Sequence, residues 1–127
     1  MKLYRFNRSR VLVFPLKLVG PSGEKWAQAI FDTGATYSMF PPSVIDAIGV
    51  DLRQSERSVK IITASSVEYV PMVTVPCIEI FGRRIEEVRV VSHFLPPGTP
   101  AQGLLGINLL QHFDYELNFS RDQLIIK

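Results

Sequence analysis

The chain has 127 residues, of which 46% are apolar and 20% are charged. This size and composition are those of one globular domain, so we expect a single domain spanning residues 1–127 and exclude an intrinsically disordered chain. The 14 basic and 12 acidic residues give a net charge of +2, which is too balanced to indicate a nucleic-acid partner.

The cysteine and histidine counts limit the chemistry further. The single cysteine, Cys77, excludes an internal disulfide and a multi-cysteine zinc site, and two histidines leave little for a metal centre, so we expect no metal and no cofactor. The apolar run at residues 11–19 is interrupted by Pro15 and Lys17 and is too short for a membrane span. The run also lacks a signal-peptide cleavage site, so we expect a cytoplasmic protein with no membrane partner.

Short β-branched runs separated by Gly, Pro and Ser fill the first half of the chain, which is typical of an all-β barrel or sandwich. Residues 10–18 and 24–31 predict two strands joined by a turn rich in Gly and Pro. Residues 44–48 predict a short helix, with Ser43 as its N-cap and Gly49 as its end.

The second half of the chain predicts hairpins and one further helix. Residues 59–75 predict a hairpin whose tip is Ala64-Ser65-Ser66, and residues 77–91 predict a second hairpin. Pro76 lies between them and predicts a bulge or a sheet edge, because proline cannot donate to a strand ladder. The leucine spacing in residues 104–113 predicts a helix, and the alternating run after it predicts a last pair of strands.

The candidate chemistry lies in Asp32-Thr33-Gly34, directly after an apolar strand. A carboxylate in this place needs hydrogen bonds, because burying it unpaired is costly. Thr33 offers a hydroxyl beside it, and Gly34 lets a backbone or a ligand approach closely. The pattern indicates a carboxylate on the floor of a cleft, although the tripeptide alone fits equally well an Asp that ends a strand and caps a turn.

The string Asp32-Thr33-Gly34-Ala35-Thr36 after an apolar strand resembles the active-site loop of the retropepsin-like aspartic peptidases. That family carries a second signature, two apolar residues and a glycine that open a helix near the C-terminus, and Leu104-Leu105-Gly106 is similar to it. The resemblance extends from about Val11 to the C-terminus and is closer to cellular than to viral members. It implies an all-β, closed acid-protease-type barrel with a flap hairpin and one or two short helices.

The activity that the resemblance implies is that of an aspartic endopeptidase, which needs one carboxylate to activate water and another to protonate the amide. The sequence contains a single Asp-Thr-Gly. We therefore expect a homodimer in which each subunit contributes Asp32 to a site on the two-fold axis. By resemblance, Thr33 would brace the partner's loop and Gly34 would bond the peptide backbone.

The resemblance also implies how a peptide or protein substrate would be held. The hairpin of residues 59–75 would be a flap that closes over an extended peptide and pairs with it. Leu104 and Leu105 would pack beneath the catalytic loop, and apolar side pockets would be walled by Met39, Ile62 and Val67. The expected substrate contacts are Ala35, Ala64, Ser65, Ser66 and Leu105.

Two departures from the family pattern leave a second function open. The flap tip has Ser65-Ser66 where glycine is usual, and Thr36 and Ile107 occupy the positions where retroviral members carry an acidic residue and its arginine partner. The alternative is a catalytically weak or inactive retropepsin-like module that binds peptides or dimerises. A basic barrel associated with nucleic acid, suggested by the Arg-rich start, is disfavoured by the small net charge.

Cysteine and histidine suggest a second, less favoured enzymatic function, with a cysteine as the nucleophile. Cys77 lies in an apolar run and is expected to pack in the core. A nucleophilic pair of Cys77 with His93 or His112 lacks any third group that would orient the histidine, so the sequence favours the aspartate chemistry.

Overall fold

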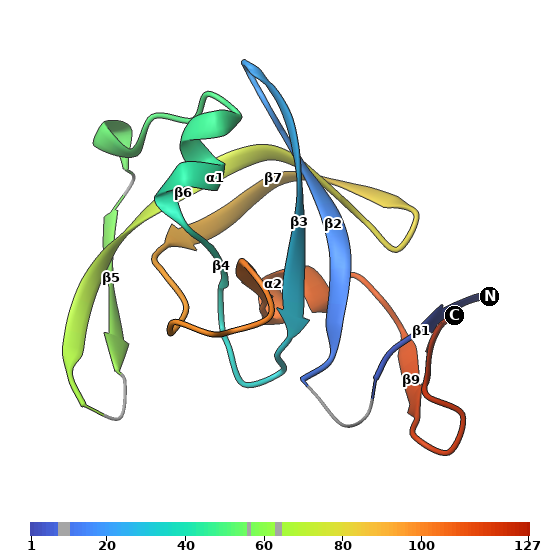
Figure 1. Cartoon of the computed structure of the whole chain (residues 1–127). Helices are drawn as coiled ribbons and strands as arrows, with labels where there is room; N and C mark the ends of the chain where they lie inside the picture. The colour runs from blue at the N-terminus through green and yellow to red at the C-terminus, as the bar shows by residue number, and fades with distance from the viewer. Residues whose placement is uncertain (8–10, 56, 63–64) are drawn as a thin grey trace.

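The computed structural model describes residues 1–7, 11–55, 57–62 and 65–127. Within these ranges the chain is built of strands with two short α-helices and one turn of 3-10 helix (Figure 1). The strands are β1 (Lys2–Arg5), β2 (Val13–Gly20), β3 (Gly23–Phe31), β4 (Ser38–Phe40), β5 (Arg57–Ile62), β6 (Val67–Ile80), β7 (Arg83–Ser92), β8 (Gly103–Leu105), β9 (Tyr115–Asn118) and β10 (Gln123–Ile126). The helical segments are α1 (Pro42–Ala47), η1 (Leu52–Gln54) and α2 (Ile107–Leu110).

Six strands form a closed barrel in the order β2-β3-β8-β4-β7-β6, and pairing of β2 with β6 closes it. The β3–β8 and β4–β7 pairs are parallel and the other pairs are antiparallel, so the barrel is mixed. The seventh strand of this sheet, β5, pairs with the first half of β6 and extends beyond the barrel (Figure 1). The expectation of a closed β-barrel with a flap-like hairpin and short helices is confirmed.

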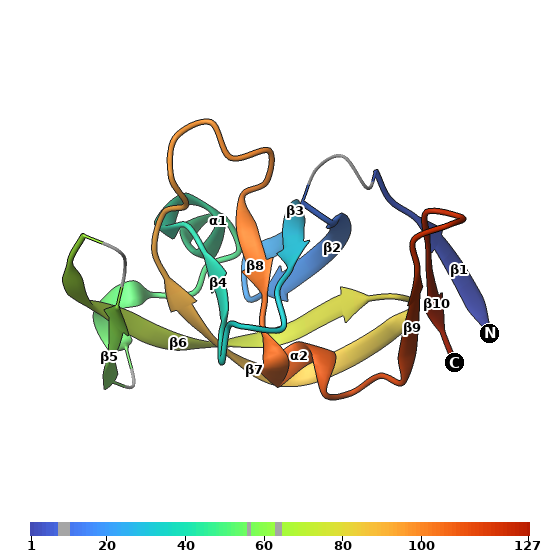
Figure 2. The same ribbon diagram turned by 90° about the horizontal axis from the view of Figure 1, so that it is seen from below.

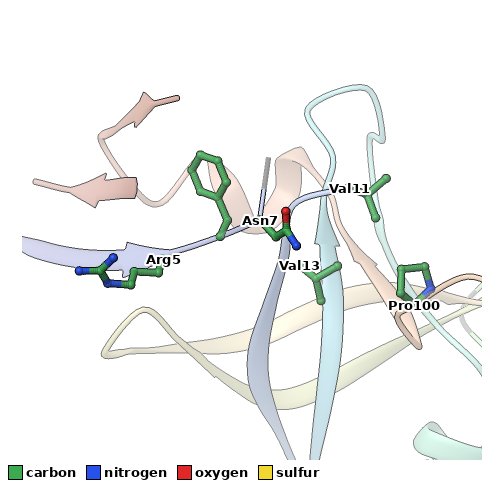
Figure 3. A pocket seen from close by; sticks show the side chains of 6 residues that line it. Arg5, Asn7, Val11, Val13 and Pro100 are labelled. Atoms are coloured by element: carbon green, nitrogen blue, oxygen red, sulfur yellow. The ribbon is translucent and has the colours of Figure 1, made fainter. Parts of the chain in front are cut away.

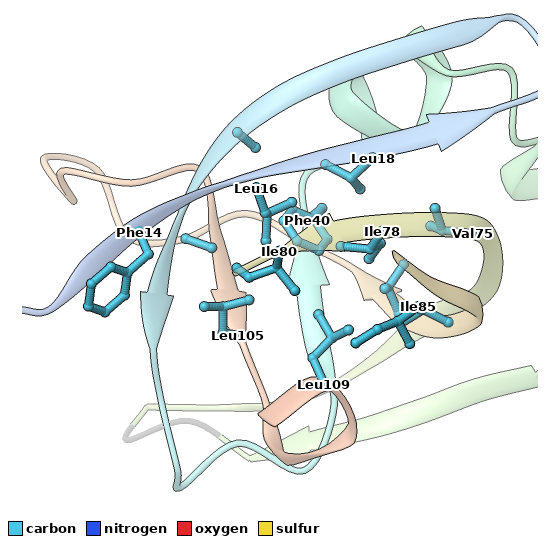
Figure 4. Packing of buried hydrophobic residues seen from close by; sticks show 14 of the residues in the cluster. Phe14, Leu16, Leu18, Phe40, Val75, Ile78, Ile80, Ile85, Leu105 and Leu109 are labelled. Atoms are coloured by element: carbon cyan, nitrogen blue, oxygen red, sulfur yellow. The ribbon is translucent and has the colours of Figure 1, made fainter. Parts of the chain in front are cut away.

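The alternation of apolar and polar residues along β2 explains how the barrel is filled. Phe14, Leu16 and Leu18 point inward and are almost completely buried, whereas Pro15 and Lys17 point outward. The inward side chains meet those of neighbouring strands in one continuous core (Figure 4). Complete burial of an aliphatic or aromatic side chain of this size contributes about 1.5–3 kcal/mol relative to exposure, so each of these positions is a substantial source of stability.

The two ends of the chain form a separate three-stranded sheet in the order β1-β10-β9 (Figure 1). Aromatic rings attach this sheet to the barrel. The Tyr4 ring lies 5.0 Å from that of Phe81, and the Tyr115 ring lies 5.0 Å from that of Phe31, measured between centroids. Tilted and edge-on contacts of this kind are favourable. Seen from below, this sheet and β5 lie on opposite sides of the loop between β3 and β4 (Figure 2).

Both helices differ from the sequence prediction. Helix α1 begins at Pro42 rather than at residue 44, and no side chain caps it, so the prediction of Ser43 as N-cap is wrong. Proline has the helical φ angle already and needs no N–H in the first turn, which explains the earlier start. Gly49 has a φ of +82° and ends the helix as predicted. Neither α-helix, among the described residues, is long and apolar enough to span a membrane.

The prediction of a helix over residues 104–113 is only partly right. Gly103–Leu105 is strand β8, and α2 covers only residues 107–110. The leucine spacing fits a helix, but Ile30 and Phe31 pair with Leu104 and Leu105 in a parallel ladder. Tertiary pairing therefore overrides the local pattern.

The two predicted hairpins share one long strand, β6, which runs through Pro76. Its register with β7 does not shift at this point, since Val75 pairs with Val88 and Cys77 pairs with Glu86. Pairing with β5 stops at Met72 and pairing with β2 begins at Cys77, so Pro76 lies where β6 has no neighbour on one side. The edge prediction is confirmed, and no register-shifting bulge occurs there.

Cys77 is a core residue, as predicted, with 2% of its surface exposed. Burial raises the pKa of its thiol, which reduces the thiolate fraction that reacts with disulfide reagents. We predict that Ellman's reagent at about pH 8 labels the native protein roughly a hundredfold or more slowly than the denatured protein, because labelling requires local opening. Equally rapid labelling of both states would show that Cys77 is accessible.

Candidate active site

Asp32 begins the loop that joins β3 to β4, and the loop itself holds the carboxylate. The Asp32 backbone N–H donates to the Leu105 carbonyl at 3.0 Å, and the Gly34 N–H donates to Asp32 Oδ1 at 2.9 Å. The side chain is half-buried. One carboxylate oxygen therefore has a fixed donor, and the residue still reaches the surface.

The two signature segments of the sequence lie side by side. Because β3 and β8 are parallel, Ile30 and Phe31 pair with Leu104 and Leu105, and both strands end at the same edge of the barrel. The chain then passes through the loop after β3 on one side and into α2 on the other. The Ile107 N–H donates to the Ala35 carbonyl at 2.8 Å and ties the helix to the loop.

A pocket of about 330 Å³ opens directly beside the loop that carries Asp32, between β3 and β4. One wall is the loop itself, Gly34 to Tyr37, and another is strand β5 from Val59 to Ile62. Met39, Val91 and Leu104 complete the lining from the barrel. The pocket therefore connects the loop that carries Asp32 with the hairpin predicted to be a flap.

Comparison with known families shows to which protein family the chain belongs. Residues 22–112 match the model of a family described as "gag-polyprotein putative aspartyl protease", a match that covers more than half of the chain and both signature segments. The chain belongs to this retropepsin-like aspartyl protease family. A search of curated proteins found no match.

Solved retropepsin-like structures share the fold. The crystal structure of a retropepsin-like aspartic protease from Rickettsia conorii is 18% identical, with a TM-score of 0.74 over 98% of this chain and 88% of that one. The retroviral protease-like domain of Ddi1 from Leishmania major is 14% identical, with a TM-score of 0.57 over 93% of this chain and 89% of that one. At these identities the likeness concerns the fold alone.

The structure brings some of the predicted site residues together in one loop and leaves others apart from them. Asp32, Thr33, Gly34 and Ala35 form one loop, with Thr33 and Gly34 exposed, and their chemical roles stay predictions. Ser65 and Ser66 lie exposed just before β6, whereas Ala64 falls outside the described residues.

The predicted role of Leu105 needs correction. Its side chain is completely buried and packs in the main core beneath the loop, so it offers no surface to a substrate. The neighbouring Leu104 lines the pocket instead. Met39 and Ile62 are pocket walls as expected, but Val67 does not line this pocket.

A second pocket, also of about 330 Å³, lies at the start of β2 (Figure 3). Its lining includes Arg5 and Asn7 from the N-terminal segment, and also Val11, Val13 and Pro100. Val13 pairs with Ile30, two residues before Asp32, so this pocket also lies near the end of β3. Among the described residues, no group of three His, Cys, Asp or Glu side chains could hold a metal ion.

A hydrogen-bond network centred on the buried Ser38, at the end of the Asp32 loop, was not predicted from the sequence. Ser38 is fully buried, and both its N–H and its hydroxyl donate to Asn108 Oδ1, at 2.8 and 2.9 Å. The Gly106 N–H donates to the Ser38 hydroxyl oxygen at 3.0 Å, and the Asn108 amide donates to the Arg89 carbonyl at 2.6 Å. Strands β4 and β7, the glycine that follows β8 and helix α2 are thereby joined through the side chains of Ser38 and Asn108.

This network also explains the second signature glycine. A Cβ at Gly106 would lie 2.5 Å from the Tyr37 carbonyl carbon and 2.8 Å from the Ser38 nitrogen, both of them backbone atoms. Any larger residue must displace the loop that follows Asp32. The uncharged Thr36 and Ile107 cannot form an ion pair, and a backbone bond from the Asn108 N–H to the Thr36 carbonyl, at 3.2 Å, joins α2 to the loop instead.

We predict that Asn108→Ala lowers the free energy of unfolding by about 1–3 kcal/mol, because it leaves the buried polar atoms of Ser38 without an acceptor. Chemical denaturation followed by fluorescence measures the loss. The matched control is Gln111→Ala, on the exposed side just after the same helix, which is expected to change stability by less than about 0.5 kcal/mol. Equal effects of the two substitutions would show that the network contributes nothing.

Proposed function

We propose that this chain is an aspartic endopeptidase that is active as a homodimer. The observation that carries the proposal is the half-buried Asp32 carboxylate, held by the Gly34 N–H at the edge of a retropepsin-like barrel. Family membership supports protease chemistry, and the loop geometry supports Asp32 as the residue that performs it.

The homodimer follows from the number of carboxylates that the reaction needs. Two carboxylates within about 3 Å of each other cannot both ionise, so they share a proton, and one acts as base on water while the other protonates the amide nitrogen. One chain provides a single Asp-Thr-Gly. A second copy, related by a two-fold axis through the loops, supplies the other carboxylate. The pair then titrates as a unit, and no single pKa belongs to either residue.

An extended peptide is the substrate class that the surroundings of Asp32 favour. Among the described residues, strand β5 pairs with β6 alone, so its other edge has backbone groups available for a peptide strand. The β5–β6 hairpin and the β3–β4 loop extend to the same side of the barrel (Figure 1). In the proposed complex, Thr33 braces the partner's loop, Gly34 bonds the peptide backbone, and Ser65 and Ser66 lie over the peptide. The cytoplasmic location stays a prediction.

We predict that Asp32→Asn reduces cleavage of unfolded protein and of fluorogenic peptides by roughly a thousandfold or more, because the amide can neither activate water nor donate a proton. The wild type is expected to work best at mildly acid pH and to be blocked by a peptide mimic with a hydroxyl at the scissile position. Asp46→Asn, at an exposed site on α1, is the matched control and retains activity. Undiminished cleavage by Asp32→Asn would refute the proposal, and tight peptide binding without turnover by the wild type would favour the non-catalytic module.

The shared site makes a second, quantitative prediction. When wild type and Asp32→Asn are co-refolded in equal amounts, about one quarter of the dimers contain two intact aspartates. The activity is therefore expected to fall to about one quarter of that of the same total amount of protein made of wild type alone. Independent active monomers would retain about one half. Sedimentation or light scattering must show a dimer for both proteins, since the substitution leaves the fold unchanged.

A further inference from the structure

The β5–β6 hairpin and the loop between β7 and β8 (residues 93–102) face each other where two neighbouring strands separate (Figure 2). Strands β6 and β7 pair as far as Met72 and Val91. Beyond this pair, β7 continues along β4, where Ser92 pairs with Phe40, whereas β6 continues along β5 into the hairpin. In the described part of the chain no strand pairing crosses this fork, so side chains are what can join its two arms.

One pair of polar side chains spans the fork. His93 Nε2 lies 2.9 Å from Glu68 Oε2, with Glu68 on β6 and His93 directly after β7. The two side chains are partly buried, with 30% of His93 and 43% of Glu68 exposed. An imidazole N–H can donate to a carboxylate whether the ring is neutral or protonated, so the contact needs no particular protonation state of the histidine.

The histidine end of this pair is fixed to the barrel. The His93 backbone N–H donates to the Phe40 carbonyl at 3.1 Å. Leu95, two residues further along, packs against a small buried cluster that is separate from the main core. This cluster consists of Met39, Val70, Met72 and Val91. The imidazole therefore extends from a backbone position that the barrel determines, and it can hold the hairpin in place.

The glutamate end of the pair continues a row of side chains on the inner face of the hairpin. Val70 and Met72 point to the same face as Glu68 and are buried in the small cluster. Ile61 pairs with Glu68 across the hairpin, packs against the cluster and lines the pocket beside the Asp32 loop. The row thus changes from apolar to charged at the position that reaches His93 across the fork.

A second side-chain contact joins the other strand of the hairpin to the Asp32 loop. Arg57, the first residue of β5, donates from its guanidinium to the hydroxyl of Tyr37 at 2.7 Å. Tyr37 is the last residue of the loop before β4. The hairpin is therefore attached through β5 to the loop that carries Asp32, and through β6 to the loop between β7 and β8.

We propose that Glu68 and His93 are positioning residues that fix the hairpin relative to the loop between β7 and β8, so that the hairpin is already in place when a peptide binds. Neither residue lines the pocket, so both act on a substrate only through the hairpin. The hold on the hairpin follows from the structure alone, and its effect on a peptide rests on the proposed function. An exposed charged pair shifts an equilibrium by about two- to fivefold, so the pair acts on the position of the hairpin and not on the fold as a whole.

Hydrogen exchange of the free protein tests the positioning without any substrate. Glu68→Ala and His93→Ala each remove the pair, so each is expected to speed exchange of the amides of residues 57–62 and 67–71 about two- to fivefold, after correction for intrinsic rates. The double variant is expected to exchange no faster than either single variant, because the two substitutions remove one shared interaction. Exchange in the hairpin of β2 and β3 is expected to stay as in the wild type.

The matched controls remove the same kinds of side chain elsewhere. Glu86→Ala removes a glutamate of β7 that lies 3.9 Å from Arg84, and His112→Ala removes an exposed histidine just after α2. Neither is expected to change exchange in the β5–β6 hairpin. Hairpin exchange as in the controls, effects that multiply in the double variant, or faster exchange throughout the barrel would each overturn the positioning role.

Peptide cleavage tests what the positioning does for the proposed peptidase. Glu68→Ala and His93→Ala are each expected to raise KM for a fluorogenic peptide about two- to fivefold with little change in kcat, because binding must then also bring the hairpin into place. His93→Gln is expected to recover part of the loss, since its amide N–H can still donate to Glu68. A loss confined to kcat, or a loss in His93→Gln equal to that in His93→Ala, would contradict a role of the hydrogen bond in binding.

The outcomes distinguish this inference from the function on which it partly rests. If Asp32→Asn ends cleavage while the variants of Glu68 and His93 change neither hairpin exchange nor KM, the peptidase function stands and the positioning role falls. If the wild type cleaves no peptide, the peptidase function falls, whereas hydrogen exchange still decides whether Glu68 and His93 hold the hairpin.

Discussion

The hydrogen bond from the Asp32 N–H to the Leu105 carbonyl joins two segments that lie far apart in the sequence, and the placement of the carboxylate depends on it. It continues the parallel ladder of β3 and β8 by one step beyond Phe31. Parallel strands end at the same edge, so the loop with Asp32 and the glycine turn into α2 emerge together. The barrel thereby fixes where the acid lies before any side chain of the site is considered.

Uncharged hydrogen bonds then hold the loop in place. Ser38 donates two bonds to the Asn108 side chain, and the Ala35 carbonyl accepts from the N–H of Ile107, the first residue of α2. Thr36 and Ile107, at the positions where the resemblance to retroviral members implied an ion pair, are uncharged. Neither partner in these bonds is charged, so ionic screening weakens them little.

Sequence reasoning captured the features that have a local cause. The strand before Asp32, the hairpins, the end of α1 at Gly49 and the buried Cys77 all follow from alternation, glycine and apolar runs. It failed where a distant segment decides. Leu104 has helical spacing but pairs as a strand, and the partners in the Ser38–Asn108 and Tyr37–Arg57 contacts are 70 and 20 residues apart. No local pattern marks such pairs, since either partner alone resembles an ordinary polar surface residue.

The proposed catalytic pair and the pocket beside the Asp32 loop differ in symmetry. One chain contains a whole pocket, walled by its own loop and its own β5, but only half of the catalytic pair. A two-fold axis through the Asp32 loops completes the pair once and duplicates the pocket. In the proposed dimer, a peptide bound across the axis therefore meets one copy of this pocket from each subunit, so the two halves of the peptide contact chemically identical surfaces.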